Sequence, residues 1–523
     1  MGFMDSVEKE LINGDMNRSR TENGALGYRT TGKYLLDLNF ATASLRKMQP
    51  TEITGKFTDA FLDNKLYALK WLFYLRDARE GLGERRSFRV IMNHLANTEP
   101  DIVKAFVKLI PEYGRYDDLM CLLGTECEAY ALAAIKEQLE KDLKNMEEGK
   151  PISLLGKWLP SCNASSKQTK KNGTVVRTYL GLSEKNYRKI LSKLREYIKI
   201  VERQMSAKEW GKINYEAVPS RANLIYNDAF LRNDEERRRE YLGSLEKGEA
   251  KINASVLFPH DIVHKYGGYY SVKNKDTAIE ALWKALPDLV EGDSSTLVVR
   301  DGSGSMTCRV DSNSSVTALD VATALAIYTL SLHDALPIST ALAIYFSERS
   351  SGEFKDKYIT FGSRPKVVDL TGMDSLRDKL IRSYRESDCS NTNIAATFDL
   401  ILNVAIKGKM KQEDMPKNVL IVSDMEFDYA TTGRPNQKLF DTIAEKFEVH
   451  GYKMPRLVFW NVNSRTGTIP VKENELGVAL VSGFSVNIIK MVLSGELDPY
   501  KCLTDQLDSE RYAPVEAAVK DLL

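Results

Sequence analysis

Short apolar runs alternate with helical stretches in the last part of the chain, and this alternation constrains the fold most strongly. Stretches such as SLRDKLIRSYRE (375–386) and NIAATFDLILNVAI (393–406) have helical periodicity. The apolar runs are STLVVRD (295–301), KYITFG (357–362), NVLIVSD (418–424), RLVFWNV (456–462) and GVALVSG (477–483). Strands that alternate with helices predict a parallel sheet covered on both faces. We therefore expect a doubly wound α/β domain over residues 290–523, with KYITFG and PKVVDL (365–370) as an antiparallel hairpin at one edge.

Residues 1–285 have helical periodicity almost throughout. Apolar residues recur at helical spacing, and Gly or Pro breaks separate successive stretches. The clearest stretches are LYALKWLFYLRDARE (66–80), CEAYALAAIKEQLEKDLKNMEE (127–148) and NYRKILSKLREYIKIVERQM (186–205). We find no repeat of fixed period, but paired helices with short breaks indicate a helical-repeat-like array. The predicted fold class is therefore α + α/β.

Composition restricts the class of protein. The chain has 523 residues, of which 43% are hydrophobic and 28% charged, as in a soluble globular protein of more than one domain. Lysine and arginine number 73 against 72 acidic residues, so net charge indicates no partner. Six cysteines without a CxxC pair disfavour a zinc site and a disulfide scaffold. Without an apolar window of about 18 residues or a signal pattern, we expect a cytoplasmic protein with no membrane contact.

Residues 151–200 are strongly basic, with eleven lysines or arginines against two acidic residues. Aromatic residues are interleaved with these cations, among them Trp158, Tyr179, Tyr187 and Tyr197. One interpretation is a solvated helix face together with a basic loop, SSKQTKKNG (165–173). The other is a nucleic-acid-binding surface. Its candidate contacts are Lys157, Lys167, Lys170, Lys171, Arg177, Lys185, Arg188 and Lys189.

Three segments at or near predicted strand ends carry oxygen ligands. VVRDGSGSM supplies Asp301, Ser303 and Ser305, SNTNIAATF supplies Thr392, and VLIVSD supplies Asp424. In a sheet of this kind, ligands bind at the carboxyl ends of the strands. Two carboxylates and three hydroxyls suit Mg²⁺ or Mn²⁺, which prefer oxygen ligands. So few negative charges would leave the metal able to take an acidic group from a partner.

The motif DGSGSM, followed by a Thr loop and a strand-ending Asp, resembles the metal-ion-dependent adhesion site of a von Willebrand factor A domain. The predicted order of strands and helices over 290–523 also resembles that domain. The resemblance implies that Asp301, Ser303, Ser305, Thr392 and Asp424 hold one divalent ion. Two departures from the pattern affect this expectation. Arg300 stands where an apolar strand residue is usual, and the Thr loop reads CSNT where glycines are common.

The whole chain resembles a family of uncharacterised proteins found mainly in bacteria and phages. The resemblance is carried by RDAREGLGERRSFR (76–89), GRYDDL (114–119), GKWLPS (156–161) and VPSRANLIY (218–226), followed by the A-type domain. This layout is similar to that of the Ro (TROVE) proteins, in which helical repeats bind RNA. The similarity is one of architecture, so it implies RNA binding only by analogy. RDAREGLGERR and GRYDD are more simply interpreted as ion-paired helix junctions.

The hexapeptide TALAIY occurs twice, at 323–328 and 340–345, with TLSLHDALPIS between the copies. The spacer resembles the translation of a widely used sequencing adapter. Deleting residues 329–345 leaves VTALDVATALAIYFSERSS, a plain helix leading to KYITFG, whereas Pro337 disfavours a continuous helix through the spacer. We interpret 329–345 as an artefact, so the native chain would have 506 residues. His333 and Asp334 are accordingly not site candidates.

The leading hypothesis is a non-enzymatic binding protein. Its metal captures an acidic group of a protein partner, and its helical half binds structured RNA as Ro-like ribonucleoproteins do. Two alternatives stay open. One is a protein-interaction adaptor that binds no nucleic acid. The other is a metal-dependent phosphoesterase, which would need more carboxylates than Asp301 and Asp424, with Glu426 and Asp428 as candidates. No catalytic residue is expected in the leading hypothesis.

Overall fold

A computed structural model describes most of the chain and divides it into two compact units. The described residues are 17–22, 24, 26–268, 271–290, 295–303, 306, 335–361, 365–386, 394–427, 439–470, 478–483, 488 and 498–523. One unit, the α/β unit, comprises Met1–Gln49 and Leu257–Gln506. The other, the helical unit, comprises Pro50–Val256 and Leu507–Leu523. Each unit is therefore built from two stretches that lie far apart in the sequence.

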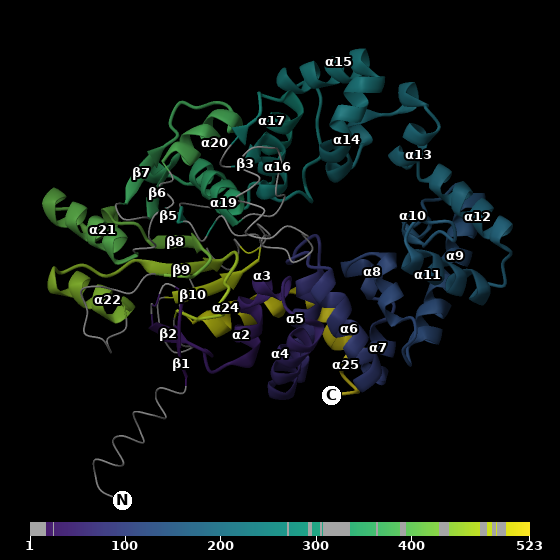
Figure 1. The fold of residues 1–523 in the computed structure, drawn as a ribbon, viewed down its shortest axis with the longest axis horizontal. Helices are drawn as coiled ribbons and strands as arrows, with labels where there is room; N and C mark the ends of the chain where they lie inside the picture. The colour runs from purple at the N-terminus through teal and green to yellow at the C-terminus, as the bar shows by residue number, and fades with distance from the viewer. Residues whose placement is uncertain are drawn as a thin grey trace, which may run out of the picture. The chain divides into compact units, whose positions relative to one another are not determined.

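A six-stranded mixed sheet forms the centre of the α/β unit. Its strands are β5 (Thr296–Asp301), β6 (Lys357–Phe361), β7 (Lys366–Asp369), β8 (Asn418–Ser423), β9 (Arg456–Asn461) and β10 (Val478–Ser482). They lie in the order β10-β9-β8-β5-β6-β7, and only the β6–β7 pair is antiparallel (Figure 1). Every residue of β5 and β9 is buried, which explains their continuous apolar sequence. The predicted α/β class and the edge hairpin are both confirmed.

The chain passes from β5 to β6 and β7 on one side, then returns to β8 on the other side of β5. The point where strand order reverses therefore lies between β5 and β8, which is where open α/β sheets bind ligands. α19 packs on β5, β6 and β8. The described helices of this unit after β5 are α19 (Ala335–Arg349), α20 (Leu376–Arg385), α21 (Ile394–Gly408), α22 (Leu439–Val449) and α24 (Pro499–Leu507), with 3-10 turns at Gly352–Phe354 and Gln412–Asp414.

The boundary between the units differs from the predicted one at residues 285–290. α16 (Pro259–Tyr266) packs on α19, and Trp283 of α17 (Thr277–Lys284) donates to Glu348 at 2.9 Å, so both helices belong to the α/β unit. A short antiparallel pair, β3 (Gly267–Gly268) and β4 (Ser271–Val272), lies between them in the chain. The prediction that residues 1–285 are mostly helical covers both helices, although it named neither. It could not tell which core they would join.

The N-terminal residues also belong to the α/β unit. They form the antiparallel pair β1 (Arg18–Arg20) and β2 (Leu26–Tyr28), followed by α2 (Tyr34–Phe40) and α3 (Thr42–Leu45). Asn461 Nδ2 donates to the Phe40 carbonyl at 2.9 Å, and the Ala43 amide donates to Ser482 Oγ at 3.0 Å. The ends of β9 and β10 therefore hold α2 and α3 by hydrogen bonds to the backbone.

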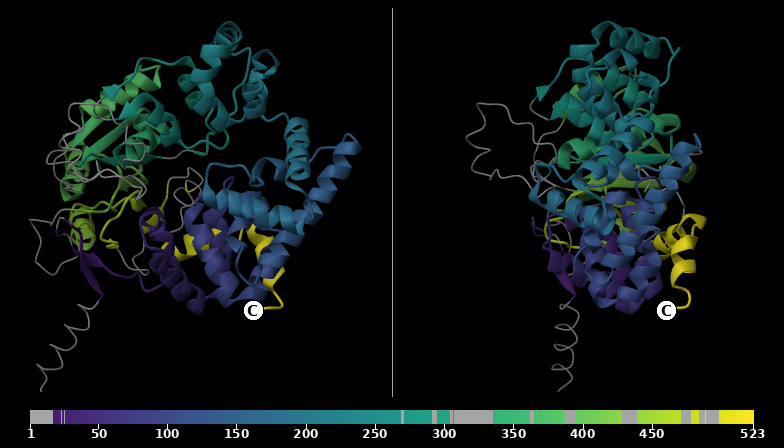
Figure 2. Two further views of the ribbon diagram at one scale, coloured as in Figure 1. Left: turned by 45° about the vertical axis from the view of Figure 1, so that its right-hand side comes forward. Right: turned by 90° about the vertical axis from the view of Figure 1, so that its right-hand side faces the viewer.

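Short helices make up the helical unit. They are α4 (Pro50–Asp63), α5 (Lys65–Arg76), α6 (Arg86–Thr98), α7 (Pro100–Phe106), α8 (Ile110–Tyr113), α9 (Glu128–Glu147), α10 (Leu155–Trp158), α11 (Lys167–Tyr179), α12 (Glu184–Tyr197), α13 (Val201–Ser206), α14 (Ser220–Asn233), α15 (Glu235–Glu246) and α25 (Ala513–Val519). Turns of 3-10 helix span Tyr116–Leu122, Trp210–Lys212, Tyr215–Ala217 and Glu510–Tyr512. α25 packs against α5 and α7, and both views of Figure 2 show the yellow C-terminal segment beside the purple and dark blue helices. Among the described residues, no helix is both long and apolar enough to cross a membrane.

RDAREGLGERR and GRYDD form an ion-paired helix junction, as predicted. Asp118 is fully buried and accepts from Arg76 Nη2 at 2.7 Å, Arg89 Nε at 2.6 Å and the Arg115 amide at 2.9 Å. A Cβ atom on Gly114 would lie 2.4 Å from Asp118 Oδ2, so only glycine fits beside this carboxylate. These motif residues serve packing and charge pairing inside the helical unit.

We expect Asp118→Asn to lower the free energy of unfolding by about 3–5 kcal/mol, because breaking a buried ion pair leaves a buried cation uncompensated. Urea denaturation followed by circular dichroism measures this loss. As a control, Glu137→Gln removes an exposed partner of Lys108 and should cost less than about 1 kcal/mol. Equal losses in the two variants would contradict the importance of the buried pairs.

The second TALAIY copy supplies the buried part of α19. All residues from Ile338 to Phe346 are buried, and Thr340 Oγ1 accepts from Arg300 Nη1 at 2.7 Å. The first copy lies outside the described residues. Because the copies are identical, deleting 323–339 yields the same protein as deleting 329–345. In the shortened chain ALDVA (318–322) would precede Thr340 in place of ALPIS (335–339), so the helical sequence would continue without Pro337.

The two copies can be compared by matched substitutions. We expect Leu342→Ala to destabilise the protein by about 2–5 kcal/mol, because it opens a cavity in the core. Leu325→Ala, at the same position in the first copy, should leave the stability unchanged, and the shortened chain should fold and unfold at a temperature at least as high. Thermal unfolding of all three proteins measures this. Equal destabilisation by the two substitutions would contradict the artefact interpretation.

Candidate metal centre and basic groove

Two of the predicted metal ligands lie at the ends of neighbouring parallel strands. Asp301 is the last residue of β5, and Asp424 follows the last residue of β8. Arg300 pairs with Val422 in the ladder, so the two strands end together at the point where strand order reverses. Both aspartates are fully buried. The β5–β8 pairing thus brings the two buried carboxylates to one edge of the sheet.

Hydrogen bonds fix the orientation of the Asp301 carboxylate. Its Oδ1 atom accepts from the Ser303 amide at 2.8 Å, and its Oδ2 atom accepts from Ser423 Oγ at 2.6 Å. Burial raises the pKa of the Asp301 carboxyl above its usual value, and these hydrogen bonds oppose that rise. Sequence reasoning missed Ser423, because alternation along a strand separates it from Asp424. The strand register identifies it.

The surroundings of Asp424 were not predicted. Asp424 Oδ1 accepts from the Glu426 amide at 3.3 Å, and Oδ2 lies 3.6 Å from Arg465 Nη2. Glu426, a candidate for a further ligand, accepts instead from the amides of Glu22 at 2.8 Å, Arg465 at 2.8 Å and Thr466 at 2.9 Å. Its carboxylate therefore holds backbone segments together. Asp428 lies outside the described residues.

The remaining predicted ligands, Ser305 and Thr392, also lie outside the described residues, as does the CSNT loop (389–392). Within the described ranges, no group of three or more His, Cys, Asp or Glu side chains is arranged to hold a metal. Asp301, Asp424 and the hydroxyls of Ser303 and Ser423 form an all-oxygen set. This chemistry fits Mg²⁺ or Mn²⁺.

Arg300 is buried and faces the helices. Its guanidinium donates to Thr340 Oγ1 of α19 at 2.7 Å and to the Ser383 carbonyl of α20 at 3.3 Å. It also lies over the ring of Tyr358, 5.7 Å from the centroid. These contacts explain how the strand accommodates a cation at a position where an apolar residue is usual.

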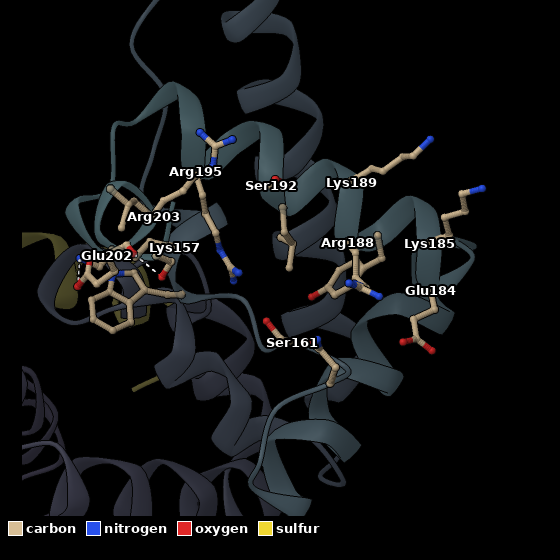
Figure 3. Close-up of a pocket in the computed structure, with 16 residues that line it drawn as sticks. Lys157, Ser161, Glu184, Lys185, Arg188, Lys189, Ser192, Arg195, Glu202 and Arg203 are labelled. Atoms are coloured by element: carbon tan, nitrogen blue, oxygen red, sulfur yellow. Dashed lines mark hydrogen bonds and ion pairs between the residues drawn. The ribbon is translucent and has the colours of Figure 1, made fainter. Parts of the chain in front are cut away.

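A basic groove of about 1110 Å³ lies in the helical unit beside α10, α12 and α13. Figure 3 shows its lining residues, with Lys185 and Lys189 projecting away from the ribbon. Its cationic residues are Lys157, Lys185, Arg188, Lys189, Arg195 and Arg203. Glu184 and Glu202 also line it, and Glu202 lies 3.6 Å from Lys157 Nζ. The groove therefore carries a net positive charge.

The groove gathers only half of the predicted nucleic-acid contacts. Lys157, Lys185, Arg188 and Lys189 line it, and the last three are exposed and form no ion pair with any described residue. The other four belong to α11 and do not line the groove: Lys167, Lys170, Lys171 and Arg177. Arg177 instead donates to the Leu182 carbonyl at 2.9 Å, next to the end of α11.

Arg195 is a groove residue that was not predicted. Its Nε and Nη2 atoms donate to the carbonyls of Gly156 at 2.8 Å and Leu159 at 3.2 Å, which fixes the guanidinium plane. Burial lowers the pKa of this guanidinium below its usual value. A Cβ atom on Gly156 would lie 2.6 Å from Leu194 Cβ, so α10 and α12 are in close contact. The motif GKWLPS therefore builds the groove floor.

The interleaved aromatic residues serve the core more than the surface. Tyr187 is fully buried and donates to the Pro160 carbonyl at 3.0 Å. Arg115 lies over the ring of Trp158, 4.2 Å from the centroid, and Tyr197 donates to the Lys150 carbonyl at 2.9 Å. Only Tyr179, on α11, exposes a large part of its ring. Groove recognition would therefore depend mainly on charge.

Comparison with known proteins gives similarity over almost the whole chain. Residues 163–298 match a family model described as "Domain of unknown function (DUF2828)", and residues 314–517 match "Domain of unknown function (DUF7788)". The first match includes α11 and α12, and the second includes strands β6 to β10. The chain is 28% identical over 537 residues to "Uncharacterized protein L728" of Acanthamoeba polyphaga mimivirus, which covers 95% of this chain and 89% of the viral protein. Both the helical and the α/β sequences thus have counterparts in one viral chain.

Proposed function

We propose that the α/β unit is a metal-dependent binding module of the von Willebrand factor A type. Asp301, Ser303, Ser305, Thr392 and Asp424 would bind Mg²⁺ or Mn²⁺, and the metal would capture an acidic group of a partner. The observation that carries this proposal is the placement of Asp301 and Asp424 at the neighbouring ends of the paired strands β5 and β8. The strand order and the single antiparallel edge strand, β7, resemble the A-domain sheet.

Two features of this unit would favour metal binding at the centre. Ser423 and the Ser303 amide hold both oxygens of Asp301, so little reorientation would accompany binding. Burial of both aspartates excludes water and strengthens their attraction for a cation. A divalent ion held by these residues would supply Lewis acidity toward an incoming oxygen ligand.

Binding is favoured over phosphoester hydrolysis by the role of Glu426. Two-metal hydrolysis needs additional carboxylates near the first pair. Both Glu426 oxygens accept from backbone amides, Oε1 from Arg465 and Thr466 and Oε2 from Glu22. Recruiting Glu426 to a second metal would break these three hydrogen bonds.

Calorimetric titration of the full chain with Mn²⁺ tests the metal centre. We expect Asp301→Asn to weaken binding at least about tenfold, because it removes one of two carboxylate ligands. Asp399→Asn is a matched control in the same unit, since Asp399 is a partly exposed partner of Lys446 and should not alter the affinity. Unchanged Mn²⁺ affinity in a folded Asp301→Asn protein would overturn the proposal.

A second proposed activity, binding of structured RNA, is favoured by the basic groove and by the Ro-like layout. Exposed Lys185, Arg188 and Lys189 follow one another along α12 and can reach a polyanion without breaking ion pairs to described residues. Neutralising phosphates releases counterions, so such binding weakens steeply with salt. The competing interpretation is a protein adaptor that uses the same groove for an acidic peptide.

Two charge-matched triple variants distinguish the groove from the rest of the basic segment. Replacing Lys185, Arg188 and Lys189 by Gln should reduce the slope of log affinity against log salt by about 2, since each phosphate contact contributes roughly 0.7–0.9. Replacing Lys167, Lys170 and Lys171 by Gln removes the same charge from α11 and should change the slope less. Titration of mixed structured RNAs at several salt concentrations measures both. Equal slopes for the two variants would overturn the assignment of the RNA contacts to the groove, and no binding by the unaltered chain would favour the adaptor.

A further inference from the structure

A cationic side chain lies next to the candidate metal centre. Arg465 belongs to the loop after β9, and β9 is the strand beside β8, so this loop begins at the same edge of the sheet. Arg465 Nη2 lies 3.6 Å from Asp424 Oδ2 and also forms an ion pair with the Glu22 carboxylate. The Asp424 side chain is fully buried, whereas 24% of Arg465 and 55% of Glu22 are exposed. One guanidinium is thus shared between a buried and an exposed carboxylate.

Backbone contacts hold Arg465 in this place. Its amide and that of Thr466 donate to Glu426 Oε1, at 2.8 and 2.9 Å. Asn461, the last residue of β9, accepts from the Ser464 amide at 2.8 Å. The loop therefore keeps its position whether or not the Arg465 side chain remains beside Asp424.

Glu22 is likewise positioned by contacts other than its own side chain. Its amide donates to Glu426 Oε2 at 2.8 Å, and Thr21 Oγ1 donates to the Phe427 carbonyl at 2.6 Å. A Cβ atom on Gly27 of β2 would lie 2.5 Å from Thr468 Cγ2, so the hairpin packs tightly on the loop after β9. Removing the Glu22 carboxylate should therefore leave the N-terminal hairpin in place.

We propose that the Arg465 guanidinium competes with a divalent metal for Asp424, and that it pairs with Glu22 instead when the metal binds. This inference rests on the proposed metal centre. A positive charge beside Asp424 offsets the negative potential that attracts a metal ion. Pairing of the same guanidinium with Glu22 lowers the cost of moving it. Metal affinity would thus depend on a residue of the N-terminal hairpin that binds no metal itself.

Mn²⁺ titration of the unaltered chain and four full-length variants tests this competition. Arg465→Gln should bind Mn²⁺ more tightly than the unaltered chain, on the order of tenfold, because the competing charge is gone. Glu22→Gln should bind several-fold more weakly, since Arg465 then loses its exposed carboxylate partner and keeps the buried one, Asp424. The double variant should match Arg465→Gln, because Glu22 acts only through Arg465. Arg465→Lys keeps the charge and should stay near the unaltered affinity.

The outcomes separate this inference from the proposed metal centre. If the unaltered chain and Arg465→Gln bind Mn²⁺ equally, the competition is overturned and the metal centre stands. A Glu22→Gln effect that persists in the Arg465→Gln background would also overturn it. If no variant binds Mn²⁺, both proposals fail. Thermal unfolding without metal identifies a variant that has lost its fold, and Arg382→Gln, which removes another cation of this unit, controls for net charge.

Discussion

The parallel pairing of β5 with β8 is the contact on which the candidate metal centre depends. Its register aligns Arg300 with Val422, so the strands end together and Ser423 can donate to Asp301. A slip of one residue would turn every side chain of β5 to the other face of the sheet. Arg300 would then leave its partners in α19 and α20. The same register therefore provides both the place for a buried arginine and the orientation of a buried carboxylate.

Glu426 connects this edge of the sheet to two segments that lie far from it in the sequence. Its carboxylate accepts backbone amides from Glu22 near the N-terminus and from the loop after β9. A buried carboxylate is stable only when hydrogen bonds satisfy it, and here backbone groups provide them. For this reason Glu426, which the sequence suggests as a possible metal ligand, instead accepts hydrogen bonds from the backbone. These hydrogen bonds also explain how Glu22 and Arg465 come to lie beside Asp424.

In the helical unit the same residue types serve two purposes. Arg76 and Arg89 pair with buried Asp118, and glycine at position 114 makes room for that carboxylate. Lys185 and Lys189, by contrast, are exposed beside the groove. Even within RDAREGLGERRSFR, Arg76 and Arg89 pair with Asp118, whereas Arg79, Arg85 and Arg86 are exposed. The excess of like charge in residues 151–200 predicted a basic surface, although it did not separate the groove residues from those of α11.

Local pattern was enough to predict the α + α/β class, the strands of the sheet, the edge hairpin and the ion-paired character of RDAREGLGERR and GRYDD, because all of these follow from periodicity and short-range composition. It also predicted that Asp301 and Asp424 lie at one edge of the sheet, since both follow buried runs that form neighbouring parallel strands. Local pattern could not predict the roles of Ser423, Arg465, Glu22 and Arg195. Their roles arise from strand register and from contacts between segments hundreds of residues apart or on different helices. Packing likewise decided which core the N-terminal segment, α16 and α17 join. The sequence of an amphipathic helix specifies an apolar face, but it does not specify which surface that face packs against.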